Sequence, residues 1–504
     1  MKYIALTIGP IFKTLSMARK TRELWAGSYL FSYIMKNIIE SLKDDVEFIL
    51  PYVGSDIFTE GNEVGLFHDR FIFREKESCK LDSYKTLENI LDYELKDLAR
   101  AMSKLFKKNG EKIEESELEE YLKNYFQIYF LEVELDKKNF KEGENEILIL
   151  NNYLDNLELN GKLISKEPKN NYIAKFMNYS NRKNEIKSDA FYSKGRWESI
   201  PEIALSELEL IQKDRKKYNN IFQNYDSENE RDIYQEVKNS FDIELKSYHK
   251  YIAIVQADGD NLGEVISNLD GKFTDFSKKL FDFAISSRDL IKDYKGVPIY
   301  AGGDDLLFFA PVVNGDRNIF NLLDDISNRY SELFKDDKSD NKKTSLSFGV
   351  SISYYKFPLY EALQEAINLL FNEAKSDKKD AIAFKVLKHS GQYFDALLHK
   401  NSSSYEKFKE LLTTSIKDTN TLNALHYKLE SQKFLLKNIV IDETKLENFF
   451  VNNFNEDIHI DNRFLKQVRE YMNIIFQEHS FFEDGFKLLF SSLRVVKFLK
   501  GEEI

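Results

Sequence analysis

Two stretches of the chain alternate apolar runs, typical of buried strands, with apolar positions at helical spacing. The elements expected in the first stretch are a strand over residues 3–8, a helix over 23–42, a strand over 46–53, charged helices over about 85–125 and a strand over 126–135. From about 136 to 245 the chain is polar, and helical pieces such as 200–217 indicate an inserted or linking region.

The second stretch is the clearer one. The elements expected there are a strand over 251–257, a helix over 273–294, two strands within 297–311 separated by Gly302-Gly303, a strand over 344–354 and a helix over 359–375. This order is typical of an α+β sandwich, with helices on one face of an antiparallel sheet. After Gly391 the pattern is helical to the end, apart from a weak strand signal near Val440.

With 504 residues, the chain is too long for one hydrophobic core. We therefore predict two α+β domains, an insertion and a helical end. The expected bounds are 1–135 for the first domain, 136–247 for a mostly helical linking region, 248–392 for the second domain and 393–504 for a C-terminal helical domain.

A weak internal repeat relates the two α+β domains. Residues 3–7 read Tyr-Ile-Ala-Leu-Thr and residues 251–255 read Tyr-Ile-Ala-Ile-Val. When the copies are aligned, Asp258 falls on Pro10 and the acidic hairpin at 302–305 falls near residues 51–54. The first copy lacks the acids of the second, so we expect the second domain to carry the chemistry.

Two acidic motifs lie at the ends of expected strands. Asp258-Gly259-Asp260 closes the strand at 251–257, and Gly-Gly-Asp-Asp at 302–305 joins two apolar runs as a hairpin. Neighbouring carboxylates raise one another's pKa unless a cation neutralises them. Glycine lets the backbone turn tightly where a phosphate approaches. The expected catalytic residues and metal ligands are Asp258, Asp304 and Asp305, and the expected nucleotide-binding residues are Gly259, Asp260, Gly302, Gly303 and Lys375.

Such acids suit Mg²⁺ or Mn²⁺, because hard divalent cations prefer carboxylate oxygens. Two such ions about 4 Å apart can bind the attacking and leaving oxygens of a phosphoryl transfer. Lys375 follows an expected helix and is the best candidate for a triphosphate contact. A lysine at a helix C-terminus also suits the helix dipole, so that role stays open.

Composition says more about the protein's cellular location and binding partners than about its activity. The net charge of −12 argues against a protein that coats nucleic acid, and places any RNA contact at a local surface or on partner subunits. The single cysteine, Cys79, excludes an internal disulfide and a cysteine-based zinc site. No apolar run is long enough to span a bilayer, and the apolar N-terminus lacks the pattern of a signal peptide. We therefore expect a cytoplasmic protein.

The acidic motifs resemble the palm domain of nucleotide cyclases, diguanylate cyclases and polymerases. More closely, the chain resembles the large polymerase-like subunit of type III CRISPR RNA-guided complexes of the Cmr subtype. The segments that carry this resemblance are 18–30 (ARKTRELWAGSYL), 195–204 (GRWESIPEIA), 258–263 (DGDNLG), 302–305 (GGDD) and 389–391 (HSG).

That resemblance implies two ferredoxin-like palm domains, the first degenerate. The second palm would bind ATP with metal at Asp258, Asp304 and Asp305, and would make cyclic oligoadenylate when the complex captures target RNA. Partner subunits, guide RNA and target RNA are implied, as are contacts of the C-terminal helices with neighbouring subunits. Many members begin with an HD nuclease domain. The first palm strand here starts at Tyr3, so no HD nuclease activity is expected.

Several alternatives stay open. Related enzymes join AMP to S-adenosylmethionine, so the acceptor is not fixed, and a non-catalytic scaffold subunit is a further hypothesis. A stand-alone diguanylate-type cyclase is disfavoured, because Leu306 follows the acids where that family has phenylalanine. We expect His389 not to be catalytic and Trp25 and Trp197 to be packing residues. The basic block of Arg19, Lys20 and Arg22 contacts RNA or a partner, or is simply solvated.

Overall fold

The computed structural model describes residues 1–54, 65–67, 69–76, 82–159, 171–180, 197–222, 232–269, 271–335, 338–339, 342–376, 378–416, 420–454 and 462–501. Cys79, Gly195 and Arg196, which the sequence singled out, lie outside these residues. None of the described helices is both long enough and apolar enough to cross a lipid bilayer.

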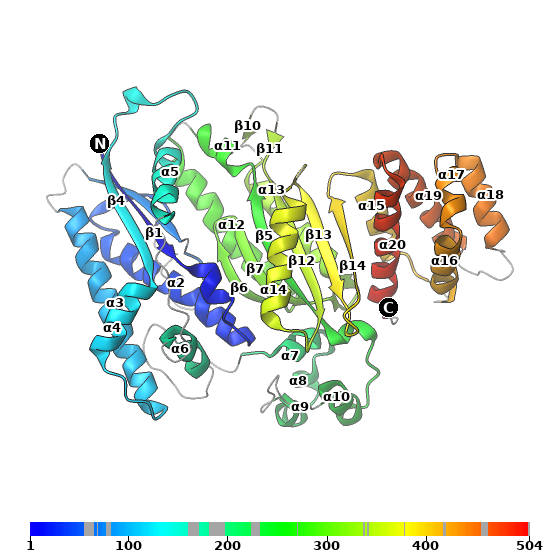
Figure 1. Cartoon of the computed structure of the whole chain (residues 1–504), viewed down its shortest axis with the longest axis horizontal. Coiled ribbons are helices and arrows are strands. Elements are labelled where there is room, and N and C mark those ends of the chain that lie inside the picture. The colour runs from blue at the N-terminus through cyan, green and yellow to red at the C-terminus, as the bar shows by residue number, and fades with distance from the viewer. Residues whose placement is uncertain are drawn as a thin grey trace.

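The N-terminal unit is a four-stranded antiparallel sheet with helices packed on it (Figure 1). Its elements are β1 Lys2–Gly9, α1 Ile11–Leu15, α2 Thr21–Leu42, β2 Val46–Leu50, β3 Arg70–Glu75, α3 Ser83–Lys108, α4 Glu115–Tyr125 and β4 Gln127–Glu134. The strand order is β2-β3-β1-β4. β1 is central and its inner positions are all buried, which explains its uninterrupted apolar sequence.

The second unit is built on a six-stranded sheet of order β14-β13-β12-β5-β7-β6. Its strands are β5 Tyr251–Asp260, β6 Val297–Gly302, β7 Asp305–Pro311, β12 Ser345–Tyr354, β13 Ala381–Leu387 and β14 Tyr393–His399. Its helices are α11 Leu262–Ser267, α12 Phe273–Asp293, α13 Ile319–Leu333 and α14 Leu359–Asn368, which continues as the π-helical turn η6 Leu369–Ala374. Two short ribbons accompany them, β8 Val313–Asn314 with β9 Arg317–Asn318, and β10 Lys338–Ser339 with β11 Lys342–Lys343.

The two units repeat one topology, which confirms the repeat seen in the sequence. The order β2-β3-β1-β4 of the first sheet recurs as β6-β7-β5-β12 in the second. Each unit runs strand, helix, two antiparallel strands, helix, strand, which is the ferredoxin-like arrangement. The second unit extends this core with β13, parallel to β12, and with β14 at the edge.

The linking region falls into two groups of helices. Its elements are η1 Lys137–Asn139, α5 Glu146–Glu158, α6 Tyr172–Ser180, α7 Ile200–Ala204, η4 Ser206–Leu208, α8 Leu210–Lys213, α9 Arg215–Phe222, α10 Ile233–Phe241 and η5 Ser247–Lys250. α5 packs on β1 and β4, and α6 packs on α2 and α3. The later helices form a small core of their own that reaches Tyr355 at the end of β12.

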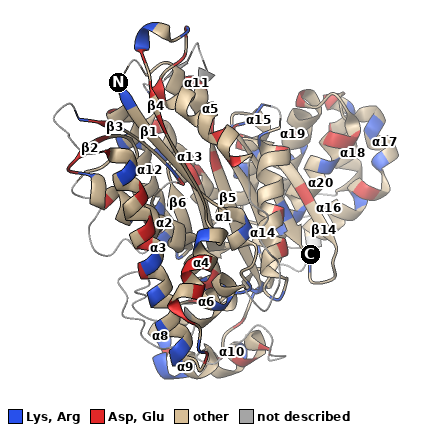
Figure 2. Ribbon diagram, turned by 60° about the vertical axis from the view of Figure 1, so that its left-hand side comes forward, with Lys and Arg blue, Asp and Glu red and all other residues tan. Residues whose placement is uncertain are grey.

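The C-terminal region is helical after β14. Its helices are α15 Ser403–Thr413, α16 Asn420–Ser431, α17 Lys433–Ile439, α18 Glu443–Asn453, α19 Asn462–Glu478 and α20 Phe482–Leu499. α20 packs against β14 and joins this region to the second sheet (Figure 1). Figure 2 shows basic and acidic residues mixed along the outer helices, in keeping with a net-acidic chain.

Three expectations were wrong in detail. The segment after Gly391 begins with strand β14, and Val440 caps helix α17 instead of marking a strand. The helix expected over 200–217 is interrupted, because Glu209 adopts φ 50 between η4 and α8. The sequence reading also missed strands β3 and β13 and helix α13.

The two units are joined at the edge strand β6. Ala301 N donates to Gly65 O at 3.0 Å, and Gly65 forms a β-bridge with Tyr300. Ser28 Oγ, on α2, donates to Ile299 O at 3.2 Å. The first unit therefore satisfies backbone groups that an open sheet edge would leave to solvent.

Candidate active site

The acidic hairpin has the tight geometry that its glycines predict. Gly302 pairs with Asp305 across β6 and β7, so Gly303 and Asp304 form a two-residue turn. Gly303 adopts φ 67, a conformation that glycine takes at little cost. Ala257 pairs with Leu306 at the end of the β5–β7 ladder, and the next residues along the two strands are Asp258 and Asp305.

Asp304 folds back against β5. Its Oδ2 accepts a hydrogen bond from Gly259 N at 3.2 Å. A Cβ atom at position 259 would lie 2.5 Å from this Oδ2 and 2.9 Å from the Tyr330 hydroxyl. Gly259 therefore permits the close approach of β5 and the hairpin, which is a more specific role than general flexibility.

Asp258 is engaged by Lys375. Lys375 Nζ lies 2.6 Å from Asp258 Oδ2 and also donates to Gly259 O at 2.8 Å. Burial and the nearby Asp304 raise the pKa of Asp258 to about 6 even though Lys375 opposes that shift. Lys375 comes directly after η6, and this turn of helix directs it to the end of β5.

The acids outnumber the local cation. Burial, together with Asp304, Asp258 and Asp69, raises the pKa of Asp305 well above its ordinary value. Burial also raises the pKa of Asp304, although Lys375 and the Gly259 amide oppose the shift. Asp69 precedes β3, so the first unit adds to the negative field at the hairpin. The site thus concentrates negative charge that a cation would relieve.

The donor atoms and the charge of these residues are of the kind that a divalent cation takes. Carboxylate oxygens are the donors that Mg²⁺ and Mn²⁺ take, and one ammonium group faces three carboxyl groups. In the parts of the chain that the structure describes, no three His, Cys, Asp or Glu side chains are grouped so that they could ligate one ion. Asp258, Asp304 and Asp305 are thus neighbours, called the acidic cluster below, but their side chains are not arranged around a single ion, and Asp258 is held by Lys375.

Asp260, which the sequence predicts as a nucleotide contact, is bonded to neighbouring strands. Its carboxylate is fully buried, and its Oδ2 accepts from Ser345 Oγ at 2.7 Å, Ser347 Oγ at 2.8 Å and Asp380 N at 3.0 Å. Its backbone carbonyl accepts from Thr344 Oγ1 at 2.7 Å. Asp260 therefore fastens the end of β5 to β12 and to the start of β13.

Asp260→Ala should destabilise the chain, because the buried Ser347 hydroxyl and two partly buried donors, Ser345 Oγ and Asp380 N, would lose their acceptor. Each buried donor left unsatisfied costs about 1–3 kcal/mol, so a lowered midpoint in urea unfolding is expected. Asp258→Asn is the matched control. It neutralises an acid whose pKa is raised to about 6, and should leave the midpoint unchanged or higher. Equal losses in both variants would contradict the distinct role given to Asp260.

The structure also places the remaining residues that the sequence singled out. Trp25 is 2% exposed, and its ring centroid lies 4.5 Å from that of Trp197, which confirms both as packing residues. Burial lowers the pKa of Arg22, so it is not a freely solvated side chain. The His389 ring packs edge-on against Tyr354 at 4.6 Å, away from the acids. Gly302 lies over the Tyr300 ring, where a Cβ atom would clash.

Sequence reasoning missed the partners that hold the acidic strand end in place. Ser345 and Ser347 carry hydroxyls at alternate positions of β12, opposite Asp260 and Asp258 in the strand register. Polar residues alternating within an apolar strand were the available signal. The Tyr330 hydroxyl forms a hydrogen bond with Thr344 Oγ1 at 2.9 Å, beside Gly259. No sequence pattern marks this contact, because the position of Tyr330 depends on the packing of α13.

Two family models match the two units. The model described as Cas10/Cmr2, second palm domain, matches residues 251–383, which include the acidic cluster. The model described as CRISPR-associated protein Cmr2, N-terminal, matches residues 3–107. Both matches agree with the resemblance drawn from the sequence motifs.

Comparison with individual known proteins also finds similarity to Cmr2 and to Cmr complexes. The CRISPR system Cmr subunit Cmr2 of Pyrococcus furiosus is 32% identical over 184 residues, covering 31% of this chain and 20% of that protein. The match therefore spans about a fifth of the relative's length. A type III-B Cmr-beta complex bound to cognate target RNA matches with a TM-score of 0.56 and 13% identity, over 91% of this chain and 78% of that chain.

A Csm1–Csm4 cassette in complex with pppApA matches with a TM-score of 0.51 and 12% identity, over 99% of this chain and 69% of that chain. At these identities the solved structures establish the fold alone. The family models add the assignment of the individual domains, so the chain carries a Cas10/Cmr2 second palm domain at residues 251–383 and a Cmr2 N-terminal domain at residues 3–107.

Proposed function

We propose that this chain is the large subunit of a type III-B CRISPR RNA-guided complex, working with other protein subunits, guide RNA and target RNA. Its second palm domain joins AMP units from ATP into a cyclic oligoadenylate when target RNA binds. The first unit acts as a degenerate palm. The observation that carries the proposal is the cluster of Asp258, Asp304 and Asp305, which two strand ends bring together beside Lys375.

The contrast between the two units supports this proposal. The first unit has the same strand order, but the positions aligned with Asp258 and the hairpin carry Pro10 and residues 51–54, without acids. Burying adjacent carboxylates is costly, and a scaffold has no need of them. The second unit keeps three acids at a cost in stability, which favours chemistry over a purely structural role.

Asp258, Asp304 and Asp305 are the residues that would hold two Mg²⁺ or Mn²⁺ ions. Bound metal supplies Lewis acidity toward the phosphate oxygens and neutralises their charge. Lys375, which pairs with Asp258 in the structure, would be the cation beside the triphosphate. Gly259 lets the hairpin approach β5, and Gly303 supplies the positive φ of the turn that carries Asp304.

Mass spectrometry of reaction products tests this function. The assembled complex, with target RNA, ATP and Mg²⁺ or Mn²⁺, should yield adenylate oligomers with the mass of a ring. A parallel reaction with S-adenosylmethionine identifies the acceptor, because AMP transfer to it gives a different mass. Absence of any ATP-derived product from the target-bound complex would leave the non-catalytic scaffold role.

Metal and ATP should also raise the thermal stability of the isolated chain. A ligand that binds only the folded state stabilises it by about 2.7 kcal/mol at 100 times its dissociation constant. We expect Mn²⁺ with ATP to raise the unfolding temperature of the wild-type chain, measured by differential scanning fluorimetry. Asp258→Ala should remove the effect of metal. Equal shifts in the two proteins would place the metal elsewhere.

A further inference from the structure

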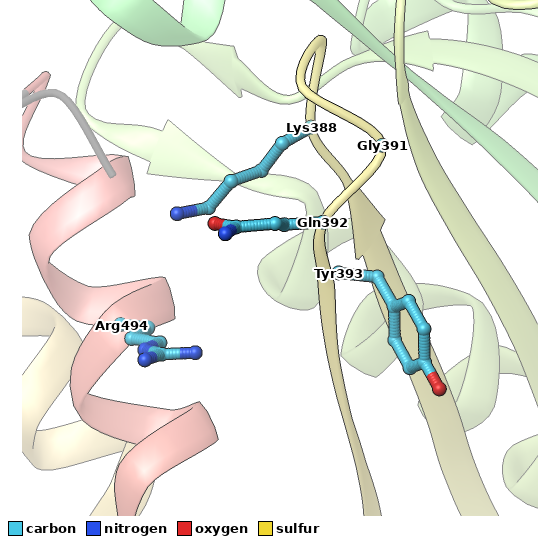
Figure 3. A pocket seen from close by; sticks show the side chains of 5 residues that line it. All are labelled: Lys388, Gly391, Gln392, Tyr393 and Arg494. Atoms are coloured by element: carbon cyan, nitrogen blue, oxygen red, sulfur yellow. The ribbon is translucent and has the colours of Figure 1, made fainter.

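A basic hollow lies between the β13–β14 hairpin and helix α20, apart from the acidic cluster. It encloses about 400 Å³ and is lined by Lys388, Gly391, Gln392, Tyr393 and Arg494. Lys388 and Gln392 extend from the hairpin toward α20, and Arg494 extends from α20 toward them, whereas the Tyr393 ring lies on the other side of the strand (Figure 3).

The hairpin turn sets this arrangement. Lys388 N donates to Gln392 O at 2.9 Å, which places the two side chains next to each other at the turn. Gly391 adopts φ 81 and closes the turn. The His-Ser-Gly segment at 389–391, which the acidic site leaves unexplained, is therefore the loop that presents Lys388 and Gln392.

Within the described part of the chain, the cations around the hollow form no ion pair, whereas their neighbours do. On the same hairpin, Lys385 Nζ pairs with Glu365 Oε1 at 2.9 Å, and on α20 Lys487 pairs with Asp395. Among the described residues, no carboxylate forms an ion pair with Lys388, Arg494 or Lys497. Burial and the nearness of Arg494 and Lys497 lower the pKa of Lys388. Positive charge is thus concentrated here in a chain that is acidic overall.

Arg494 is held with its donors available. Its Nε donates to His426 Nε2 at 3.3 Å, and its guanidinium lies 5.8 Å from the centre of the Phe394 ring. Burial, and then Arg494, Lys497 and Lys388, lower the pKa of His426 to about 4, so this ring is neutral and can accept. With Nε engaged, the terminal nitrogens of the guanidinium are directed toward the hollow (Figure 3).

We propose that this hollow binds a phosphate group, carried either by RNA or by a nucleotide. The planar guanidinium matches two phosphate oxygens, the ammonium adds a point charge and the Gln392 amide adds a neutral donor. A carboxylate or an RNA phosphodiester brings one negative charge to the two lining cations, Lys388 and Arg494, whereas a terminal phosphate brings about two. The site is separate from the acidic cluster and does not depend on the reaction there.

Binding measurements without divalent metal test the site independently of catalysis. The probes are inorganic pyrophosphate, followed by calorimetry, and short single-stranded RNA, followed by fluorescence anisotropy. Lys388→Ala with Arg494→Ala should weaken binding by about tenfold or more and reduce the slope of log affinity against log salt by about one for each phosphate that is no longer bound. Arg494→Lys keeps the charge but removes the fork of donors, so its effect should be smaller.

The control removes the same charge elsewhere. Lys437 and Lys445 are exposed on α17 and α18, and Lys437→Ala with Lys445→Ala should leave both affinities within about twofold. Weaker binding of both probes in the Lys388–Arg494 variant supports a site for the RNA phosphodiester. Weaker binding of pyrophosphate alone supports a free or nucleotide phosphate. Affinities equal to those of the control variant for both probes would overturn the proposal.

Discussion

Replacing Asp304 and Asp305 together with asparagine should abolish formation of oligoadenylate while making the metal-free chain more stable. Activity should fall by at least about 10²-fold, the scale for loss of one preorganised electrostatic group. Stability should rise because burial, and for Asp305 the neighbouring acids, raise the pKa of both carboxyls, so ionisation is unfavourable in the folded state. Asparagine removes that cost and can still accept from Gly259 N, as Asp304 does.

Two measurements on the same protein check this result. ATP conversion is followed in the target-bound complex, and the unfolding temperature is followed with a chelator present. Target RNA affinity serves as the control for assembly and should not change. A variant that loses activity and also unfolds at a lower temperature would indicate that the two aspartates hold the fold together.

Gly259→Ala should damage the site through geometry and leave its charge intact. The new methyl group would lie 2.5 Å from Asp304 Oδ2 and 3.0 Å from Asp304 Cβ, so the hairpin or the end of β5 must move. Overpacking of this kind costs about 1–3 kcal/mol. A displacement of about 1 Å in a catalytic group can lower activity by about 10²-fold.

Gly263→Ala is the matched control, four residues further along the chain. Its added Cβ atom meets nothing within 4 Å, and the residue lies in helix α11, where alanine is preferred to glycine. Stability should stay the same or rise by about 0.5–1 kcal/mol, and activity should be retained. A similar loss of turnover in both variants would show that the loop, and not the contact between Gly259 and Asp304, is the sensitive feature.

The central part of the second unit could be predicted because each signal there is local. The apolar run of β5, the Gly-Gly turn between β6 and β7 and the helical spacing of α12 each depend on neighbouring residues only. The nearness of Asp258 to the hairpin, which the sequence also predicted, is fixed by the antiparallel pairing of β5 with the distant strand β7. The repeat indicated that the first unit is related to the second, although strand β3 of its sheet was missed.

The rest depended on tertiary contacts that no short pattern records. β14 has seven residues, too few to separate strand from helix spacing, and its place is set by β13 and α20. Asp260 stands two residues from Asp258 and was predicted to bind nucleotide. Only the register with β12 shows that Ser345 and Ser347 hold it inside the fold.

The position of Lys375 near the site could be predicted from the sequence, but its contact with Asp258 could not. Its position after a helix marked it as a cation near the site, and the structure places it there. Its engagement with Asp258 follows from the π-helical turn η6, which a regular helical repeat does not predict. Its contact with a triphosphate stays a prediction.

The bonds from Ser28 and Gly65 to strand β6 also bear on how this protein can be handled. These contacts cover the backbone of Ile299 and Ala301 on the outer edge of β6. A fragment beginning near β5 would expose Ile299 O and Ala301 N, which could pair with a strand of another molecule. We expect such a fragment to aggregate in solution. The N-terminal unit thus keeps the second unit soluble, and we expect a fragment that lacks it to be insoluble.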